Sequence, residues 1–166
     1  MIIQTPYIVC NSYMLDELSK LKKTVPDSKI LINSVENGDN FMASSDYTYR
    51  KKKIWNVGIP VFEYDGGYST HGKSMIIDDD ISMIGSYNMD LRSTYVDTEL
   101  MLVVKSKGLT KELLGYMNDM EHDSRRVTPE GTYEFPDHIE KPRMPLLKNV
   151  LMHIVGVIMQ PFRVML

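Results

Sequence analysis

Two short polar clusters at a fixed separation constrain this chain more than any other feature of its sequence. Together they read HxKxxxxDxxxxxxGSxN, a pattern that occurs once in the chain. Chance would produce six fixed residues at this spacing in about a few sequences per million. The fixed positions are His71, Lys73, Asp78, Gly85, Ser86 and Asn88.

Each polar cluster lies in an apolar, β-rich stretch, and these stretches predict adjacent strands at about 71–77 and 82–88. The acidic triplet between them, Asp78-Asp79-Asp80, predicts the connecting turn. Three carboxylates in one tight turn are more often a solvated loop than a cation site, because calcium and magnesium need a distributed set of oxygen ligands. We therefore expect no metal at this turn.

The register of these two strands decides whether the polar side chains meet. Side chains two residues apart on a strand lie on the same face, roughly 6.6 Å apart. His71 and Lys73 therefore share a face of one strand, and Ser86 and Asn88 share a face of the other. A turn with an even number of residues places His71 opposite Asn88 and Lys73 opposite Ser86, whereas an odd number puts the pairs on opposite faces. We expect the even turn, which gathers all four side chains.

Such a cluster has the chemistry of a phosphoryl-transfer site. Lys73 supplies a positive charge, and Ser86 and Asn88 supply neutral donors, which suits the stabilisation of charge on phosphoryl oxygens. His71 can act as a nucleophile or a proton donor near neutral pH. Gly85 has no Cβ and so allows close approach of backbone and substrate. This arrangement requires neither a metal nor a cofactor, and we expect none.

The composition limits the kinds of partner. Of 166 residues, 43% are hydrophobic, which is enough for a buried core. The net charge is −3, whereas nonspecific nucleic-acid binding needs a basic surface, so we expect no nucleic-acid partner. The lone Cys10 cannot form an internal disulfide. His122, His138 and His153 show no spacing that pairs them with a ligand, and we expect no metal at any of them.

Strand-like and helix-like stretches alternate along the first part of the chain, which predicts an α/β fold with a mixed β-sheet flanked by helices. Predicted strands lie at 2–9, 29–33, 59–64 and 99–105, and predicted helices at about 12–23, 41–56 and 110–122. We divide the chain into a catalytic half-domain at 1–122, an irregular connector at 123–143 that is rich in Pro, Glu, Asp and Arg, and a C-terminal amphipathic helix at 144–166.

The C-terminal helix combines a broad apolar face with basic residues, and no acidic residue follows Glu140. The basic residues are Lys141, Arg143, Lys148 and Arg163. Such a combination is typical of a helix that lies on an anionic bilayer surface. The alternative is a terminal helix that packs on its own domain or on an absent second half. No stretch reaches the roughly eighteen apolar residues that a membrane span requires.

The motif resembles that of the phospholipase D superfamily, and the chain resembles the C-terminal half of bacterial cardiolipin synthases over about residues 2–122. Gln4-Thr5-Pro6-Tyr7 looks like the family's opening strand. The run from Gly85 to Ser93 looks like its extended GSxNxDxRS signature, which is typical of the synthase-like branch. Gly72 departs from the more usual small side chain between the motif's His and Lys.

The resemblance implies a role for each motif residue. His71 would be the nucleophile, forming a phosphohistidine intermediate, or the general acid that protonates the leaving alcohol. Lys73 and Asn88 would bind phosphoryl oxygens, with Ser86 in support. Glu99, where the family keeps an acidic residue, would orient His71 through its second ring nitrogen. Asp78 belongs to the motif, and we expect it to have a structural role at the turn.

The resemblance implies transfer of a phosphatidyl group between two phosphatidylglycerols with release of glycerol; water as acceptor would make the enzyme a phospholipase. The family's active site is a pseudo-dimer of two motifs, so we expect a fragment that needs a second motif, at the cytoplasmic side of a bacterial cell membrane. One alternative is a homodimeric phosphodiesterase or nuclease. Another is a non-catalytic segment kept for membrane or subunit association.

Overall fold

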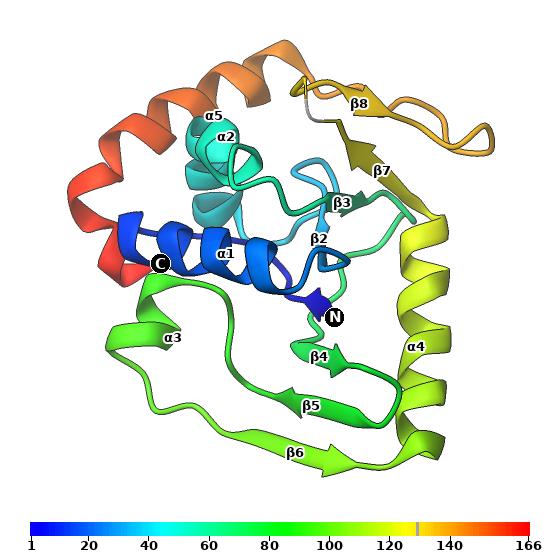
Figure 1. Ribbon diagram of the computed structural model, residues 1–166. Helices are drawn as coiled ribbons and strands as arrows, with labels where there is room; N and C mark the ends of the chain where they lie inside the picture. Colours follow the sequence, from blue (N-terminus) through cyan, green and yellow to red (C-terminus); the bar gives the residue numbers. More distant parts are fainter. Residues whose placement is uncertain (129) are drawn as a thin grey trace.

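The computed structural model describes residues 1–128 and 130–166. Within them, one mixed sheet of eight strands has the order β6-β5-β4-β1-β2-β3-β7-β8, and helices flank it (Figure 1). The strands are β1 Ile2–Gln4, β2 Lys29–Asn33, β3 Val61–Tyr64, β4 Ser74–Ile77, β5 Ile81–Gly85, β6 Met101–Lys105, β7 Ser124–Val127 and β8 Tyr133–Glu134. The predicted α/β class is confirmed.

Helices cover both faces of the central strands. One apolar cluster joins the face of Ile3 and Ile30 to α1 and α2, and another joins the face of Ile2 and Leu31 to α4. The helix α5 packs outside α2. The helical elements are α1 Ser12–Thr24, α2 Phe41–Trp55, α3 Leu91–Tyr95, α4 Lys107–His122, α5 Leu146–Ile158 and the 3-10 helix η1 Gln160–Met165.

Side-chain caps explain where the long helices begin. The Asn11 side chain accepts a hydrogen bond from the Met14 amide at 2.9 Å, and Asn40 accepts one from the Ala43 amide at 3.0 Å. Ser106 caps α4 in the same way. Each cap satisfies an amide that the first helical turn leaves without a partner.

The segment after α4 differs from the prediction, because the expected irregular connector 123–143 contains two strands. β7 pairs with β3, and β8 pairs with β7. Arg125 of β7 is buried and donates to Glu63 Oε2 at 2.7 Å and 2.9 Å. Tyr47 donates to the other oxygen of Glu63 at 2.7 Å. The polar composition suggested a loop, but these polar groups satisfy one another inside the protein.

The end of the chain is fixed against α2. An added Cβ at Gly156 would lie 2.5 Å from the Ser45 carbonyl oxygen, so only glycine allows α5 to approach this closely. Arg163 donates to both oxygens of the fully buried Asp46, at 2.6 Å and 3.0 Å, and to the Cys10 carbonyl at 2.8 Å. Among the described residues, no helix combines the length and apolar character needed to cross a membrane.

We expect Asp46→Asn to lower the free energy of unfolding by about 3 kcal/mol, because it leaves the buried guanidinium of Arg163 without a countercharge. Urea denaturation measures the change. Glu17→Gln is the control, since it removes an exposed ion pair with Lys20 and should change stability by about 0.5 kcal/mol or less. A loss below about 1 kcal/mol for Asp46→Asn would show that the pair does not hold the C-terminal segment.

Candidate functional site

The buried side chain of Asn33 fixes the backbone that leads into the motif. At the end of β2, its Nδ2 donates to the carbonyls of Pro6 at 3.1 Å and Thr70 at 2.8 Å. Its Oδ1 accepts from the Thr70 amide at 2.9 Å and hydroxyl at 3.1 Å. One amide therefore joins the segment after β1 to the residue that precedes His71. The sequence analysis missed Asn33, because only the fold brings these segments together.

A second buried amide supports the start of β4. Gln4 accepts from the Ser74 hydroxyl at 2.7 Å and donates to the Tyr116 hydroxyl at 3.2 Å. An added Cβ at Gly72 would lie 2.7 Å from the Gln4 amide nitrogen. A side chain at position 72 would therefore displace the Gln4 amide from its hydrogen bonds to Ser74 and Tyr116.

The predicted even turn between the motif strands is wrong. Ile77 pairs with Ile81, so three residues form the turn, and the Gly85 amide donates to the Lys73 carbonyl at 3.1 Å. Lys73 thus faces Gly85 rather than Ser86. Asp78 has a φ of 55°, a left-handed conformation that Asp tolerates better than most residues, and it permits this turn.

The polar residues still meet, because the chain leaves the β4 ladder after Gly85. The Ser86 amide donates to the Leu100 carbonyl at 3.0 Å, and the Ser86 hydroxyl accepts from the Leu100 amide at 3.0 Å. An added Cβ at Gly85 would lie 2.0 Å from the Leu100 carbonyl oxygen. This close approach of the strands β5 and β6 brings Ser86 beside Glu99.

Glu99 is the centre of a small polar network. Hydrogen bonds from the hydroxyls of Ser86 and Ser93 hold the pKa of Glu99 below its ordinary value, and the positive charge of Lys73 acts in the same direction. Burial lowers the pKa of Lys73, while the negative charge of Glu99 opposes that shift. Ser93 is the last residue of the extended signature, and the sequence analysis gave it no role; it accepts a hydrogen bond from Asn88 Nδ2 at 3.4 Å.

The structure thus gathers Lys73, Ser86, Asn88 and Glu99, with His71 beside them. The Lys73 ammonium donates to the His71 carbonyl at 2.8 Å, and the His71 side chain is exposed. Among the described residues, Asn88 Oδ1 is buried without a hydrogen-bond partner.

Glu99 lies differently from expectation, whereas Asp78 lies in the turn as expected. Glu99 interacts with Ser86, Ser93 and Lys73, and no hydrogen bond within the described part of the chain joins it to the His71 ring. Asp78 is exposed at the far end of the hairpin, separated from Lys73 by the whole of β4. It therefore belongs to the turn, as its motif position suggested, and not to the polar network.

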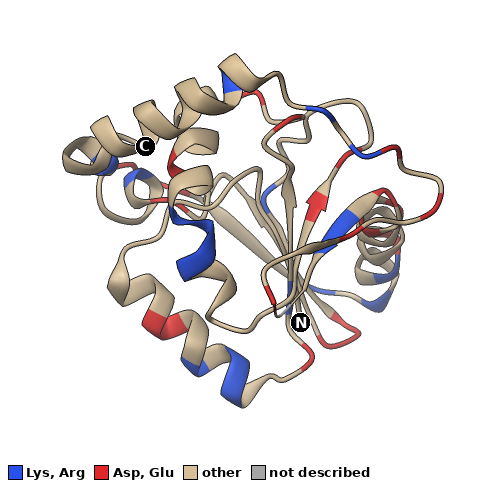
Figure 2. Cartoon of the chain, turned by 90° about the horizontal axis from the view of Figure 1, so that it is seen from above, with Lys and Arg blue, Asp and Glu red and all other residues tan. Residues whose placement is uncertain are grey.

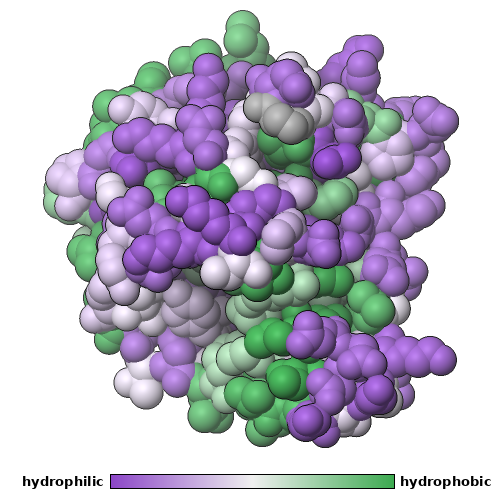
Figure 3. Space-filling model, in the orientation of Figure 1, coloured by the Kyte–Doolittle hydropathy of each residue, from purple (hydrophilic) through white to green (hydrophobic). Residues whose placement is uncertain are grey.

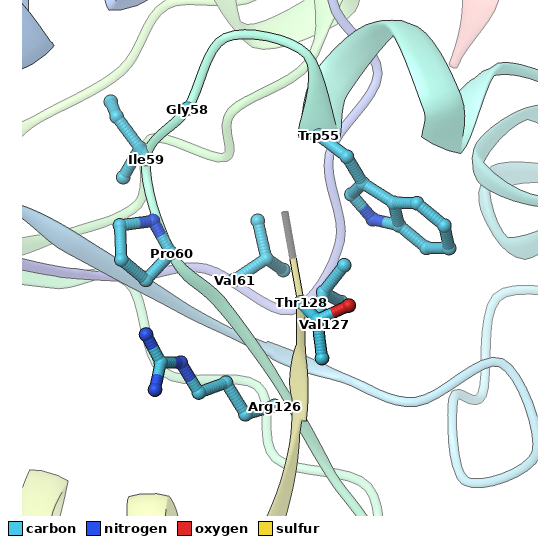
Figure 4. A pocket seen from close by; sticks show the side chains of 8 residues that line it. All are labelled: Trp55, Gly58, Ile59, Pro60, Val61, Arg126, Val127 and Thr128. Atoms are coloured by element: carbon cyan, nitrogen blue, oxygen red, sulfur yellow. The ribbon is translucent and has the colours of Figure 1, made fainter. Parts of the chain in front are cut away.

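A cavity of about 370 Å³ opens beside Asn88 and Ser93. Tyr7 and Asp90 also line it, and burial together with the Asp90 carboxylate raises the pKa of Tyr7. Another cavity, of about 160 Å³, lies between the start of β3 and the end of β7 (Figure 4). Its lining is mostly apolar, with Arg126 as its charged residue, and it does not include the motif.

Solved structures share this fold. Nuc from Salmonella typhimurium, a phospholipase D family member, is 24% identical, with a TM-score of 0.60 over 75% of this chain and 78% of its own. Phosphatidylserine synthase from Haemophilus influenzae is 16% identical, with a TM-score of 0.65 over 99% of this chain and 41% of its own. The chain therefore shares the fold of these proteins, and its motif resembles that of the phospholipase D superfamily.

The chain belongs to the family described as cardiolipin synthase, PLD-like domain, whose model matches residues 1–121. Cardiolipin synthase A of Yersinia pseudotuberculosis is 25% identical over 119 residues, which are 72% of this chain. Cardiolipin synthase A of Yersinia pestis has the same identity and coverage. The chain spans 24% of the length of these relatives.

We expect Gly85→Ala to destabilise the protein by about 1–3 kcal/mol, because the new methyl group meets the backbone of β6 and forces the strands apart. Thermal or urea unfolding measures this loss. The control is Gly115→Ala on the exposed face of α4, where an added Cβ meets nothing within 4 Å, and it should stabilise by about 0.5–1 kcal/mol. Equal effects of the two substitutions would contradict the close approach at Gly85.

Proposed function

We propose that this chain supplies one half of a phosphatidyltransferase site of the cardiolipin synthase type. The observation that carries the proposal is the network of Lys73, Ser86, Asn88 and Glu99 beside the exposed His71. Lysine and amide donors stabilise a phosphoryl group that gains negative charge during transfer. Membership of the synthase family supports a lipid phosphodiester as substrate.

In the proposed reaction, a histidine nitrogen attacks the phosphorus of phosphatidylglycerol, a P–N bond forms, and the P–O bond to glycerol breaks. A second histidine donates the proton that the leaving glycerol oxygen needs. The hydroxyl of another phosphatidylglycerol then attacks phosphorus, loses its proton to the second histidine and releases the first. His71 fills one of these two histidine roles, and the other motif supplies the remaining one.

Glu99 has a different role in this proposal from the one that the family resemblance implied. The Glu99 carboxylate accepts from the Ser86 and Ser93 hydroxyls, which lower its pKa, and it balances the charge of Lys73. Lys73 and Asn88 are then positioned for phosphoryl oxygens before substrate binds. Glu99 therefore positions the phosphate-binding groups, and His71 remains free to face the second half.

The second half would pack on an apolar surface next to the network. Figure 3 shows hydrophobic side chains gathered over β4, β5 and β6 in the lower part of the view. Around Ser86 and Glu99, several large apolar side chains are exposed, and contiguous apolar patches of this kind mark interaction surfaces. They are Ile84 and Leu102, which pair across β5 and β6, and Leu100 next to Ser86, and they are 39%, 63% and 79% exposed.

A homodimeric phosphodiesterase or nuclease is the alternative. The match to Nuc from Salmonella typhimurium covers 78% of that chain, which shows that a phospholipase D family member can have about this size. The net charge of −3 argues against nucleic acid as the substrate of this chain.

The test incubates the chain with vesicles of labelled phosphatidylglycerol and, separately, with DNA. In samples whose assemblies bring two motifs together, we expect phosphodiester turnover on lipid but not on DNA, at least about 10³-fold lower in His71→Ala, because the variant lacks the nucleophile or the general acid. The matched control Lys111→Ala removes an exposed charge of α4 and should leave turnover unchanged. Turnover that survives His71→Ala would refute the mechanism, and cleavage of DNA but not lipid would favour the alternative.

We propose that α5 attaches the protein to the cytoplasmic surface of a bacterial membrane. Leu147, Val150, Ile154 and Ile158 are between 48% and 80% exposed on this helix. Figure 2 shows α5, which leads to the terminus marked C, almost free of charged residues. Lys148 is its charged residue. A basic residue at the border of an apolar face suits an anionic bilayer.

Arg163 does not contribute to this surface, although the sequence suggested that it would. It is 8% exposed and paired with Asp46. The charge available for lipid therefore comes from Lys141, Arg143 and Lys148.

We expect Leu147→Asp to reduce binding to vesicles containing phosphatidylglycerol by about tenfold or more, because it removes an 80% exposed apolar side chain and adds repulsion from the lipid headgroups. Co-sedimentation measures the bound fraction. Tyr13→Asp on α1, a side chain 64% exposed, is the control and should bind as the parent does. Equal losses in both variants would show that general charge, and not α5, governs binding.

A further inference from the structure

Two histidines and an aspartate meet where α4 ends. His122 is the last residue of α4, and Asp123 follows it. His138 comes from the segment between β8 and α5. The Nδ1 of His122 lies 2.9 Å from Asp123 Oδ1, and the Nε2 of His138 lies 3.1 Å from the same oxygen. In Figure 1 the loop that follows β8 lies near the end of α4 where β7 begins.

The three side chains are arranged as one face of a coordination site. The imidazole rings stack with centroids 4.2 Å apart and planes inclined by 19°, so a nitrogen of each ring lies beside the shared carboxylate oxygen. One nitrogen from each ring and the oxygen all lie within 4.8 Å of one another. In a tetrahedral zinc site with bonds of about 2.0–2.1 Å, neighbouring ligand atoms are about 3.3 Å apart. Small side-chain shifts would bring the three atoms to these positions.

We propose that His122, Asp123 and His138 bind a divalent transition-metal ion, with Zn²⁺ as the best match. Two imidazole nitrogens and one carboxylate oxygen favour zinc over magnesium or calcium, which prefer oxygen ligands. A cavity of about 610 Å³ lined by His122 and His138 gives access to solvent, which supplies a water as the fourth ligand.

The backbone around the site supports binding. The Asp123 carbonyl accepts from the Asp65 amide at 2.9 Å, so the residue that contributes the carboxylate is tied to the end of β3. The triplet Asp78-Asp79-Asp80 offers a useful contrast, since Asp79 pairs with Lys107 and Asp80 with Lys105. Neither Lys nor Arg forms an ion pair with Asp123 within the described residues, and its partners are the two histidines.

Binding would join two parts of the chain that are 15 residues apart, Asp123 and His138. The ion would fasten the segment that leads to α5 onto the end of α4. The site stands apart from the phosphoryl-transfer network, because it shares no residue with that network. Its test therefore does not depend on the proposed enzymatic reaction.

Isothermal titration of the metal-free chain with Zn²⁺ tests the site, and Co²⁺ provides a spectroscopic probe of tetrahedral geometry. We expect one ion per chain, visible d–d absorption of bound Co²⁺, and a higher unfolding temperature in the presence of Zn²⁺. His138→Ala and Asp123→Asn should each weaken binding by more than tenfold and abolish the rise in unfolding temperature. The matched control His153→Ala alters an exposed histidine of α5 and should bind Zn²⁺ as the parent does.

Far-UV circular dichroism of each variant separates loss of the site from loss of the fold. His138→Asn, which keeps a polar side chain of similar size, gives a second test if His138→Ala is unstable. Binding weaker than about 1 mM in the parent would overturn the proposal. Equal binding by the parent and a folded His138 variant would also overturn it.

Discussion

The four hydrogen bonds of the buried Asn33 amide are the constraint on which the site depends. They join the segment after β1, the end of β2 and the residue before His71. A polar group buried this deeply is costly unless its donors and acceptors are satisfied, and here all of its contacts are to backbone or to Thr70. The position of the motif is therefore fixed by the same interactions that complete the parallel part of the sheet.

A second consequence of this arrangement is that the polar network is organised before any substrate binds. Glu99 holds two hydroxyls and faces Lys73, and the contact between Gly85 and Leu100 keeps these groups together. Preorganised charges and donors cost little rearrangement during transfer. The exposed His71 and the apolar side chains of β5 and β6 lie next to this network, which is the arrangement that a second catalytic half would complete.

Much of the fold could be predicted because the main elements carry local signals. Asn11 and the apolar spacing after it mark α1, and the apolar run 29–33 marks β2. The motif's fixed spacing identified Lys73, Ser86 and Asn88 and, through the family resemblance, Glu99. Long-range polar contacts gave no such signal. Arg125 contributed to the composition that made the strand β7 look like a loop, since its charge is balanced by Glu63 only when β7 lies on β3.

The features that the sequence did not predict also depend on backbone conformations and contacts that form only in the folded chain. We expected an even turn because, in a regular ladder, only an even turn brings the four polar side chains of the motif together. In the structure Asp78 adopts a left-handed conformation within a three-residue turn, and the chain leaves the ladder after Gly85. Ser93 lay outside the motif's fixed positions, and its contact with Asn88 depends on the start of α3. His122 and His138 come together only because β7 and β8 return the chain to the end of α4.

The central claim is that the chain provides one motif of a two-motif site. The most direct test measures turnover of labelled phosphatidylglycerol against chain concentration while analytical ultracentrifugation gives the mass in the same samples. The account predicts no turnover from monomers, and activity that rises with the fraction of chains in a two-motif assembly. Turnover proportional to chain concentration in samples that contain only monomers would contradict it.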